Sequence, residues 1–305
     1  MDFDTFCKHL RVPNWKGDRL ELVKLAPTGY QKRVVDSLLN NKISICAKFR
    51  RGGFSTKSVA FALWNLLVNN KSTLFFTYKD REAIELQRMG RSMIESMCES
   101  ARWFGTTSVY QALGKEIINR LNFNDHEIRT ATQKIQFHSV GAMKGWAPDY
   151  LILDEIAFAP DMEQNWKAIW PMASTKAHTL IVSSLSGRGW FEKMWLDSLQ
   201  NNNLATPIVV SYLECPLYWD AGFVKQMQDN LGPKAYRSEI LCDPHVFDDK
   251  VKFKGKFQEA DPVNRQGRMY PHEVMADAIA TYCCKKLDKP LERAFKNTLV
   301  KTGLV

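Results

Sequence analysis

Three short apolar runs without polar alternation constrain the fold of this chain more than any other feature. They are ISICAKF at 43–49, YLILDE at 150–155 and HTLIVSSL at 178–185. A strand with one face in water alternates apolar and polar residues, whereas a parallel strand covered by helices on both faces is apolar along its whole length. The runs therefore predict the buried strands of a parallel sheet.

Segments with helical character separate these strands. Residues 55–69 are predicted as a helix, and so are residues 80–99, where apolar residues recur at helical spacing among long, charged ones. Residues 72–78 and 128–139 are predicted as further strands. This alternation predicts an α/β protein with a doubly wound, mainly parallel sheet, in which ligands bind at the carboxyl ends of the strands.

Length and a change of composition divide the chain in two. Its 305 residues exceed the usual size of one domain. After about Pro244 the sequence is charged, poor in apolar runs and punctuated by glycine and proline, until a last helical stretch, HEVMADAIATYCCKKL. We expect a main domain at 1–245, followed at 246–305 by a linker and a small C-terminal helical appendage.

Charge and hydropathy narrow the class of protein. The chain carries 42 Lys and Arg against 33 Asp and Glu, a formal net charge of +9. This favours a polyanionic partner such as nucleic acid, although a basic surface kept for solubility explains the charge equally well. With no signal peptide and no run near the roughly 18 apolar residues of a membrane span, we expect a soluble intracellular protein with no membrane partner. Seven cysteines without a CxxC pair disfavour a zinc site.

A basic segment with two glycines lies between the first predicted strand and the first helix. It is KFRRGGFST, residues 48–56. In the usual phosphate-binding loop, GxxxxGK[ST], backbone N–H groups surround the phosphates, a lysine reaches the β and γ oxygens, and a hydroxyl holds Mg²⁺. Aligned on Gly53, this segment has Phe54 in the lysine position, whereas Ser55 keeps the metal-binding hydroxyl.

The missing lysine has a candidate replacement at the entrance of the loop. The long side chain of Lys48 can reach the same phosphate oxygens from the other side, and Arg50 and Arg51 are also available. The competing interpretation is a plain connection from strand to helix without a ligand. The residues expected to line a nucleotide are Lys48, Arg50, Arg51, Gly52, Gly53, Phe54, Ser55 and Thr56.

Two adjacent acids end the strand YLILDE about 100 residues later. At the carboxyl edge of a sheet, Asp154 can hold Mg²⁺ and Glu155 can polarise the water that attacks a γ-phosphate. In the alternative interpretation, the two acids only open a polar loop. Together with the loop, they predict a catalytic set of Lys48, Asp154 and Glu155, with Ser55 and Asp154 as metal ligands.

These segments, in this order, resemble a known family. The loop KFRRGGFST, the strand LILDE with IAFAPDMEQNWKAIWPMAS after it, and IVSSLSGRGWFEKMW follow one another as in the ATPase domain of the large terminase subunit of tailed phages. A subset of that family carries the loop lysine at the front of the motif, as Lys48 does here. The resemblance covers about residues 25–245 and ends with YRSEILCDP, which contains Glu239.

The resemblance implies a fold and an activity. The fold is the additional-strand (ASCE or RecA-like) P-loop NTPase, and the activity is hydrolysis of ATP with Mg²⁺, coupled to translocation of double-stranded DNA into a viral procapsid. The implied partners are double-stranded DNA, the portal protein, the small terminase subunit and further copies of this chain in a homo-oligomeric ring on the portal. The implied location is the host cytoplasm, and transiently the procapsid portal.

The resemblance also implies roles for residues outside the loop and the acidic strand. Tyr30 and Gln31 match the adenine-recognition motif, although a solvent-facing Gln on an ordinary helix fits the sequence as well. Ser183 and Ser184 match the coupling motif that senses the γ-phosphate, unless they only end a buried strand. Lys144 stands where the family often has arginine, so a contribution from that position is in doubt.

We expect no complete nuclease domain of the kind that usually follows in this family, because the residues after 245 are too few for one. His272, Glu273 and Asp277 resemble the last helix of such a nuclease, but a basic amphipathic tail helix explains them better. Two other functions remain as alternatives to the packaging motor. One is a nucleic-acid helicase or translocase of similar fold, and the other is a catalytically decayed adaptor that binds DNA or the portal.

Overall fold

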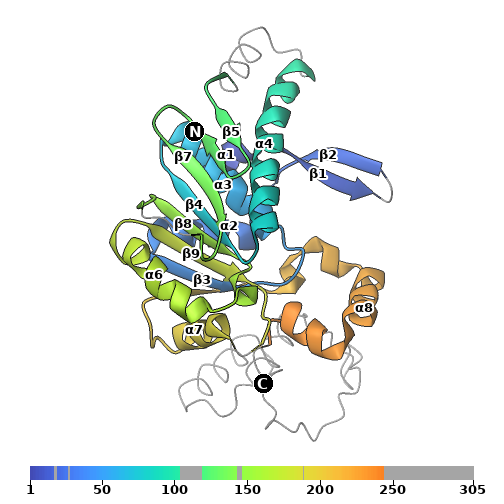
Figure 1. The fold of residues 1–305 in the computed structure, drawn as a ribbon. Coiled ribbons are helices and arrows are strands. Elements are labelled where there is room, and N and C mark those ends of the chain that lie inside the picture. The colour runs from blue at the N-terminus through green and yellow to red at the C-terminus, as the bar shows by residue number, and fades with distance from the viewer. Residues whose placement is uncertain (17–18, 27, 104–118, 143–145, 188, 244–305) are drawn as a thin grey trace, which may run out of the picture.

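A β-sheet with helices on both faces forms the body of the protein (Figure 1). The computed structural model describes residues 1–16, 19–26, 28–103, 119–142, 146–187 and 189–243. In chain order the elements are α1 (Phe3–Cys7), β1 (Arg11–Lys16), β2 (Arg19–Lys24), α2 (Gly29–Asn40), β3 (Ile43–Ala47), α3 (Phe54–Val68), β4 (Thr73–Thr77), α4 (Asp80–Trp103), β5 (Asn122–Asn124), β6 (Glu127–Arg129), β7 (Lys134–Ser139), β8 (Tyr150–Asp154), η1 (Ile156–Phe158), α6 (Met162–Thr175), β9 (His178–Ser183), α7 (Trp190–Leu199), β10 (Thr206–Val209), η2 (Tyr212–Glu214), η3 (Pro216–Trp219) and α8 (Ala221–Glu239).

The main sheet has eight strands in the order β10-β3-β9-β8-β4-β7-β6-β5. The six strands from β10 to β7 are parallel, and the short strands β6 and β5 are added antiparallel at one edge. A second sheet contains only β1 and β2, which form an antiparallel hairpin that projects from the body beside α4 (Figure 1). The expected α/β fold with a mainly parallel sheet is therefore confirmed.

Six of the expected elements are confirmed to within a few residues, namely β3, β4, β8, β9, α3 and α4. The single strand expected over 128–139 is wrong, because β6 and β7 form an antiparallel hairpin there. Its turn is closed by the Thr130 N–H, which donates to the carbonyl of Gln133 at 2.9 Å, and by the Gln133 N–H, which donates to Thr130 Oγ1 at 3.0 Å. A threonine that bonds its own neighbouring backbone in this way interrupts an otherwise strand-like sequence.

The buried strands point alternate residues into two separate apolar cores. In β8, Ile152 packs with α2, α3 and α4 on one face, whereas Leu151 and Leu153 pack with α6 and α7 on the other. Each of these side chains is fully buried, and each contributes roughly 1.5–3 kcal/mol relative to exposure. Because both faces are covered, the strands are apolar throughout, as the sequence predicts.

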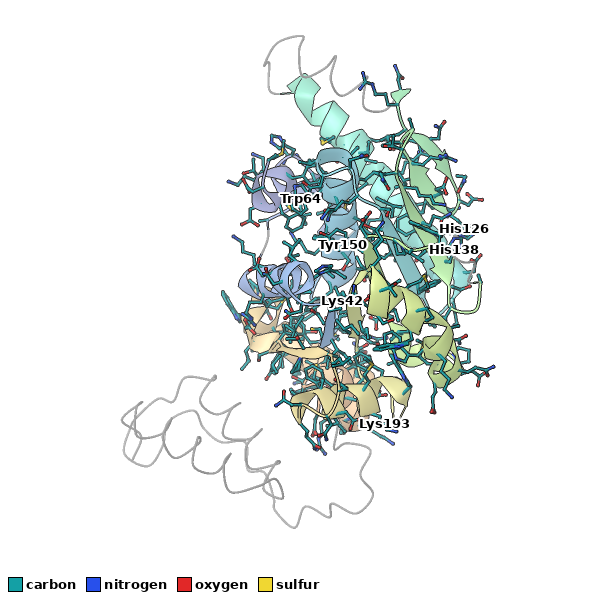
Figure 2. All side chains as sticks on the ribbon, turned by 90° about the vertical axis from the view of Figure 1, so that its left-hand side faces the viewer. Lys42, Trp64, His126, His138, Tyr150 and Lys193 are labelled. Atoms are coloured by element: carbon teal, nitrogen blue, oxygen red, sulfur yellow. The ribbon has the colours of Figure 1, made fainter. Side chains whose placement is uncertain are left out.

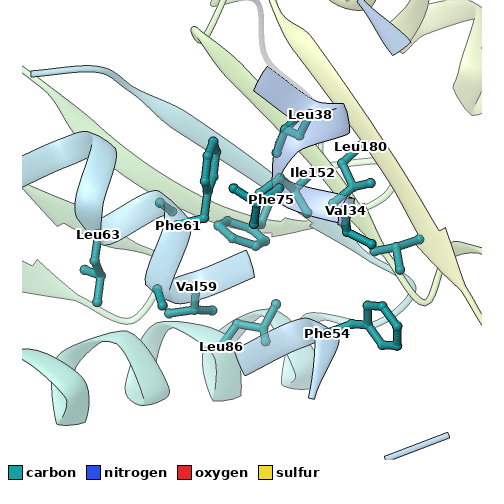
Figure 3. Close-up of a cluster of buried hydrophobic side chains, with 14 of the residues drawn as sticks. Val34, Leu38, Phe54, Val59, Phe61, Leu63, Phe75, Leu86, Ile152 and Leu180 are labelled. Carbon is teal, nitrogen blue, oxygen red and sulfur yellow. The ribbon is translucent and has the colours of Figure 1, made fainter. Parts of the chain in front are cut away.

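The helix α3 runs through the larger core and connects it to the loop before it. Figure 3 shows Val59, Phe61 and Leu63 of α3 among side chains from neighbouring elements, with Phe54 at the start of the helix. Tyr150, at the beginning of β8, packs edge-on against Phe61 with ring centroids 4.9 Å apart. In Figure 2, Tyr150 lies inside the molecule and Lys193 of α7 lies at its lower end. The core therefore fixes the first turn of α3.

Some of the sequence-based expectations concern residues outside the described part of the chain. These are the appendage at 246–305, with His272, Glu273 and Asp277, and the position of Lys144. None of the helices in the described part of the chain is long and apolar enough to cross a membrane.

Candidate active site

The segment between β3 and α3, where the sequence predicts a phosphate-binding loop, turns tightly around two glycines. Gly53 has φ of 70°, and a Cβ added to it would lie 2.8 Å from the side-chain nitrogen of Gln31. A Cβ on Gly52 would come within 2.4 Å of the Phe54 ring. Arg51 also has a positive φ, of 59°. The two glycines are therefore required by the close packing and the left-handed turn of the loop.

Phe54, in the usual lysine position, belongs to the core. Its ring is 3% exposed and packs against Tyr30 at 5.5 Å and against Phe49 at 5.7 Å between centroids. Lys48 Nζ lies 6.0 Å from the centroid of the same ring. Phe54 can therefore offer a nucleotide only its backbone, because its ring belongs to the apolar cluster that Figure 3 shows.

Tyr30 and Gln31, expected at the adenine, bind the backbone of the loop. The Tyr30 hydroxyl and the Gln31 side-chain nitrogen both donate to the carbonyl of Gly52, at 2.9 and 2.8 Å. Gln31 also accepts from the Thr28 N–H at 3.2 Å, which caps the start of α2. Both side chains are buried, at 3% and 7% exposure. Both residues therefore lie at the site, where their side chains hydrogen-bond the backbone of the loop.

Lys48 and Glu155 meet at the carboxyl edge of the sheet. Lys48 follows β3, Glu155 follows β8, and their side chains form an ion pair in which the ammonium donates to Glu155 Oε1. Burial disfavours the charged form of Lys48, but Glu155 and Asp154 outweigh it and raise the pKa of the amine. Burial likewise disfavours ionised Glu155, but Lys48 and the donors of Ser184 outweigh it and lower the pKa of that carboxyl. Both groups are therefore charged at neutral pH.

The two serines that end β9 hold the other oxygen of Glu155. The N–H and the hydroxyl of Ser184 each donate to Glu155 Oε2 at 3.1 Å, and the Ser183 hydroxyl lies 3.3 Å from the same atom. Glu155 itself has φ of 53°, a left-handed conformation that is unfavourable for a residue with a side chain. The expected coupling serines therefore contact the expected catalytic acid, and their hydrogen bonds hold its carboxylate in place.

Asp154 lies beneath this pair and has the properties of a metal ligand. It is 3% exposed, and within the described residues its Oδ1 is buried without a hydrogen-bond partner. Burial raises the pKa of Asp154 to about 6, Glu155 adds to the increase, and Lys48 and a hydrogen bond from Ser55 oppose it. An orphaned carboxylate oxygen beside a hydroxyl is a donor set that Mg²⁺ prefers, so Asp154 and Ser55 fit the expected ion.

Arg50 forms an ion pair with Glu239, a residue far from it in the sequence. Its Nε lies 2.7 Å from Glu239 Oε2, at the end of α8, and its N–H donates to the carbonyl of Glu239 at 3.0 Å. Burial raises the pKa of Glu239, whereas Arg50 acts against that rise. Arg50 is thus engaged with α8, and Arg51 is exposed.

Two residues that shape the site were not found from the sequence. Glu192 accepts from the N–H groups of Ser186 at 2.7 Å, Gly187 at 3.0 Å and Gly189 at 3.1 Å, and so orders the loop that follows β9. Its place at the third position of α7 is a capping signal that sequence analysis can detect. Tyr218 of η3 donates to the carbonyl of Arg50 at 2.7 Å, and no sequence motif marks it.

The order of the strands defines the class of fold. β9 lies between β3, which carries the loop, and β8, which carries the two acids. A strand inserted between these two is the defining feature of additional-strand P-loop NTPases. The chain therefore has the fold of that class, and its loop and its two acids lie at the carboxyl ends of β3 and β8.

Solved structures of phage terminases share this fold. The ATPase domain of the large terminase of Thermus Phage P74-26 has a TM-score of 0.52 to this chain at 15% sequence identity, covering 70% of this chain and 92% of that one. The HK97 bacteriophage large terminase has a TM-score of 0.50 at 13% identity, covering 69% of this chain and 43% of that one. No family model and no curated protein matches the sequence, so the likeness is one of fold.

Proposed function

We propose that this chain is an ATPase that hydrolyses the γ-phosphate bond of ATP as part of a DNA-packaging motor. The observation that carries the proposal is the convergence of Lys48, Asp154 and Glu155 at one point of the sheet edge, beside a glycine turn. A cation, a buried acid with an orphaned oxygen and an acid fixed by hydrogen bonds are the parts that phosphoryl transfer to water requires. The terminase fold supports the same conclusion.

In the proposed reaction each side chain has a separate role. Glu155 orients the attacking water and accepts its proton, because its carboxylate is held by the serines at the end of β9. Lys48 has three donors, of which Glu155 uses one, so it can also stabilise charge on the phosphate oxygens. Asp154 and Ser55 would hold Mg²⁺, which neutralises phosphate charge when it is bound.

We further propose that hydrolysis drives double-stranded DNA into a procapsid. Residues 1–245 would form the ATPase domain, assembled as a homo-oligomeric ring on the portal protein in the host cytoplasm, with the small terminase subunit delivering DNA. Residues 246–305 would form an appendage. The net charge of +9 is consistent with a polyanionic cargo.

The test is ATPase activity with and without DNA and portal protein, in the wild type and in Glu155→Gln. We expect the variant to bind ATP and to lose at least about 100-fold in turnover, because the proton acceptor is removed while the binding contacts remain. Glu163→Gln, which changes an exposed acid on α6, is the matched control and keeps wild-type turnover. Full turnover in Glu155→Gln would contradict the assignment.

Two other outcomes would select the alternative functions. Unwinding of a forked duplex without any capsid component would favour a helicase or translocase of the same fold. Failure of the wild type to bind ATP at millimolar concentration would favour a decayed adaptor for DNA or the portal. The second alternative is motivated by Phe54, which removes the usual loop lysine.

A further inference from the structure

The proposed phosphate-binding loop is hydrogen-bonded by the segment from η3 to α8, which carries no recognised motif. The Tyr218 hydroxyl of η3 donates to the carbonyl of Arg50 at 2.7 Å. The Arg50 N–H donates to the carbonyl of Glu239 at 3.0 Å, and the two side chains form an ion pair. The segment from η3 to α8 therefore forms hydrogen bonds with both backbone groups of Arg50, the N–H and the carbonyl.

Aromatic packing places Tyr218 directly beneath the loop. Its ring is 3% exposed and packs edge-on against Phe49, with centroids 5.7 Å apart at 86°. Phe49 in turn packs against Tyr30 at 5.4 Å and Phe54 at 5.7 Å. These four rings form a base under the loop, which we call the aromatic base. Tyr218 is also held by Tyr212 and Phe223, with centroids 5.5 and 5.2 Å away, so its hydroxyl points in one direction and the bond to Arg50 is preorganised.

Two tyrosine hydroxyls of the aromatic base each bind one carbonyl of the loop. Tyr30 donates to the carbonyl of Gly52, two residues after the carbonyl that Tyr218 fixes. A peptide group is planar and trans, so its C=O and the following N–H point in opposite directions. Fixing the carbonyl of Arg50 toward η3 therefore directs the Arg51 N–H away from η3. Fixing the carbonyl of Gly52 in the same manner orients the Gly53 N–H.

Successive N–H groups that point to the same side of a turn form an anion-binding concavity. In a loop of this kind those N–H groups contact the phosphates. We propose that Tyr218 is a positioning residue of the nucleotide site, which holds the Arg51 peptide group in the orientation that phosphate binding requires. This inference rests on the proposed function, because it assigns a role within the same site.

The position of Phe54 is consistent with this role. A lysine in its place could not complete the aromatic base, because Phe54 contacts both Tyr30 and Phe49. The chain thus combines a displaced loop lysine with a ring that supports the loop. Tyr218 and Tyr30 act on the loop through the carbonyls of Arg50 and Gly52.

The experiment compares Tyr218→Phe with the wild type and with Tyr212→Phe. Tyr212 packs on Tyr218 with centroids 5.5 Å apart, one ring further from the loop, so its variant removes a neighbouring hydroxyl without touching Arg50. The measurements are KM and kcat for ATP, the Kd for ADP by calorimetry, and amide exchange of residues 50–55 without nucleotide.

For Tyr218→Phe we expect KM and the Kd for ADP to rise by about three- to tenfold, the size of one hydrogen bond, with kcat changed less than about twofold. Amide exchange in residues 50–55 becomes faster, and the unfolding midpoint falls by only the few degrees that loss of one hydrogen bond costs, because the ring is retained. Tyr212→Phe shows none of these changes.

The outcomes distinguish a failure of the proposed function from a failure of the role assigned to Tyr218. A wild type that neither binds nor hydrolyses ATP defeats the proposed function and this inference together. A wild type that binds ATP, with Tyr218→Phe binding it equally well and exchanging its loop amides at the same rate, defeats this inference alone. Equal losses in Tyr212→Phe and Tyr218→Phe also defeat it, because they would assign the effect to packing of the aromatic base and not to the bond with Arg50.

Discussion

The ammonium of Lys48 and the carboxylate of Glu155 form an ion pair between side chains 107 residues apart in the sequence. The side chain of Lys48 is 7% exposed and that of Glu155 is 27% exposed, so the pair is largely removed from water. Charges in such surroundings interact more strongly than at the surface, and loss of one partner leaves the other poorly solvated. Activity and stability are therefore linked at this pair.

Lys48→Ala is expected to abolish ATP hydrolysis and to destabilise the fold. Removal of the ammonium leaves the buried charge of Glu155 without its cation, which costs about 3 kcal/mol in the free energy of unfolding. Urea denaturation and an ATPase assay measure the two effects. The control is Lys193→Ala, at an exposed position on α7, and it should behave as the wild type (Figure 2). Turnover near the wild-type level in Lys48→Ala would contradict the displaced-lysine mechanism.

Phe54→Lys is expected to destabilise the protein without restoring the function of Lys48→Ala. The new side chain would replace a buried ring that packs against Tyr30 and Phe49. We expect a loss of about 3 kcal/mol or more in the free energy of unfolding, measured with urea. Leu217→Lys, at a position that is 51% exposed, should lower the free energy of unfolding by less than about 0.5 kcal/mol. Recovery of hydrolysis in the double variant Lys48→Ala/Phe54→Lys would show that the usual lysine position is still usable.

Asp154 should make stability depend on pH between about 4 and 6. Its pKa is raised by burial to about 6 in the folded protein, above the unfolded value of 3.8, so the folded state binds this proton more tightly. The contribution of Asp154 to stability therefore falls as pH rises through this window and stays low above it. We expect the stability of Asp154→Asn relative to the wild type to increase by about 2 kcal/mol from pH 4 to pH 7. Urea denaturation across this range measures it.

A matched control and a second measurement accompany the Asp154 experiment. Asp229→Asn changes an exposed carboxylate on α8 and should show no such pH-dependent difference. In the wild type, the acid limb of kcat/KM should lie near pH 6 and move to lower pH as Mg²⁺ is raised, because a bound cation favours the ionised carboxylate. A limb that is independent of Mg²⁺ would count against Asp154 as a ligand.

Lys57→Met is expected to stabilise the protein. Lys57 lies on α3, is 3% exposed and has its ammonium 3.7 Å from Cys7 Sγ and 5.6 Å from the centroid of the Phe3 ring. Burial lowers the pKa of Lys57, with Cys7 opposing the change, so the charge destabilises the fold below the folded pKa and this penalty is lost as pH rises toward 10.5. We expect a gain of about 1–2 kcal/mol at pH 7 by urea denaturation. No gain, or the same gain in Lys193→Met, would contradict this account.

The sequence by itself determined the elements that depend on local pattern. Apolar runs without alternation located β3, β8 and β9, because strands covered on both faces have no polar side. Glycines between a strand and a helix located the loop, and two acids at the end of an apolar strand located Asp154 and Glu155. The hairpin of β6 and β7 was missed, because a side-chain bond from Thr130 within a β-branched run leaves no mark on periodicity.

Only the tertiary structure decided how these parts act on one another. It paired Lys48 with Glu155, turned Tyr30 and Gln31 toward the carbonyl of Gly52, and brought Tyr218 to a loop 168 residues earlier in the chain. Spacing along a sequence encodes which face of a helix or strand a residue occupies. It does not encode which distant carbonyl a hydroxyl will reach, because that depends on the order of strands and on packing between elements far apart in the chain.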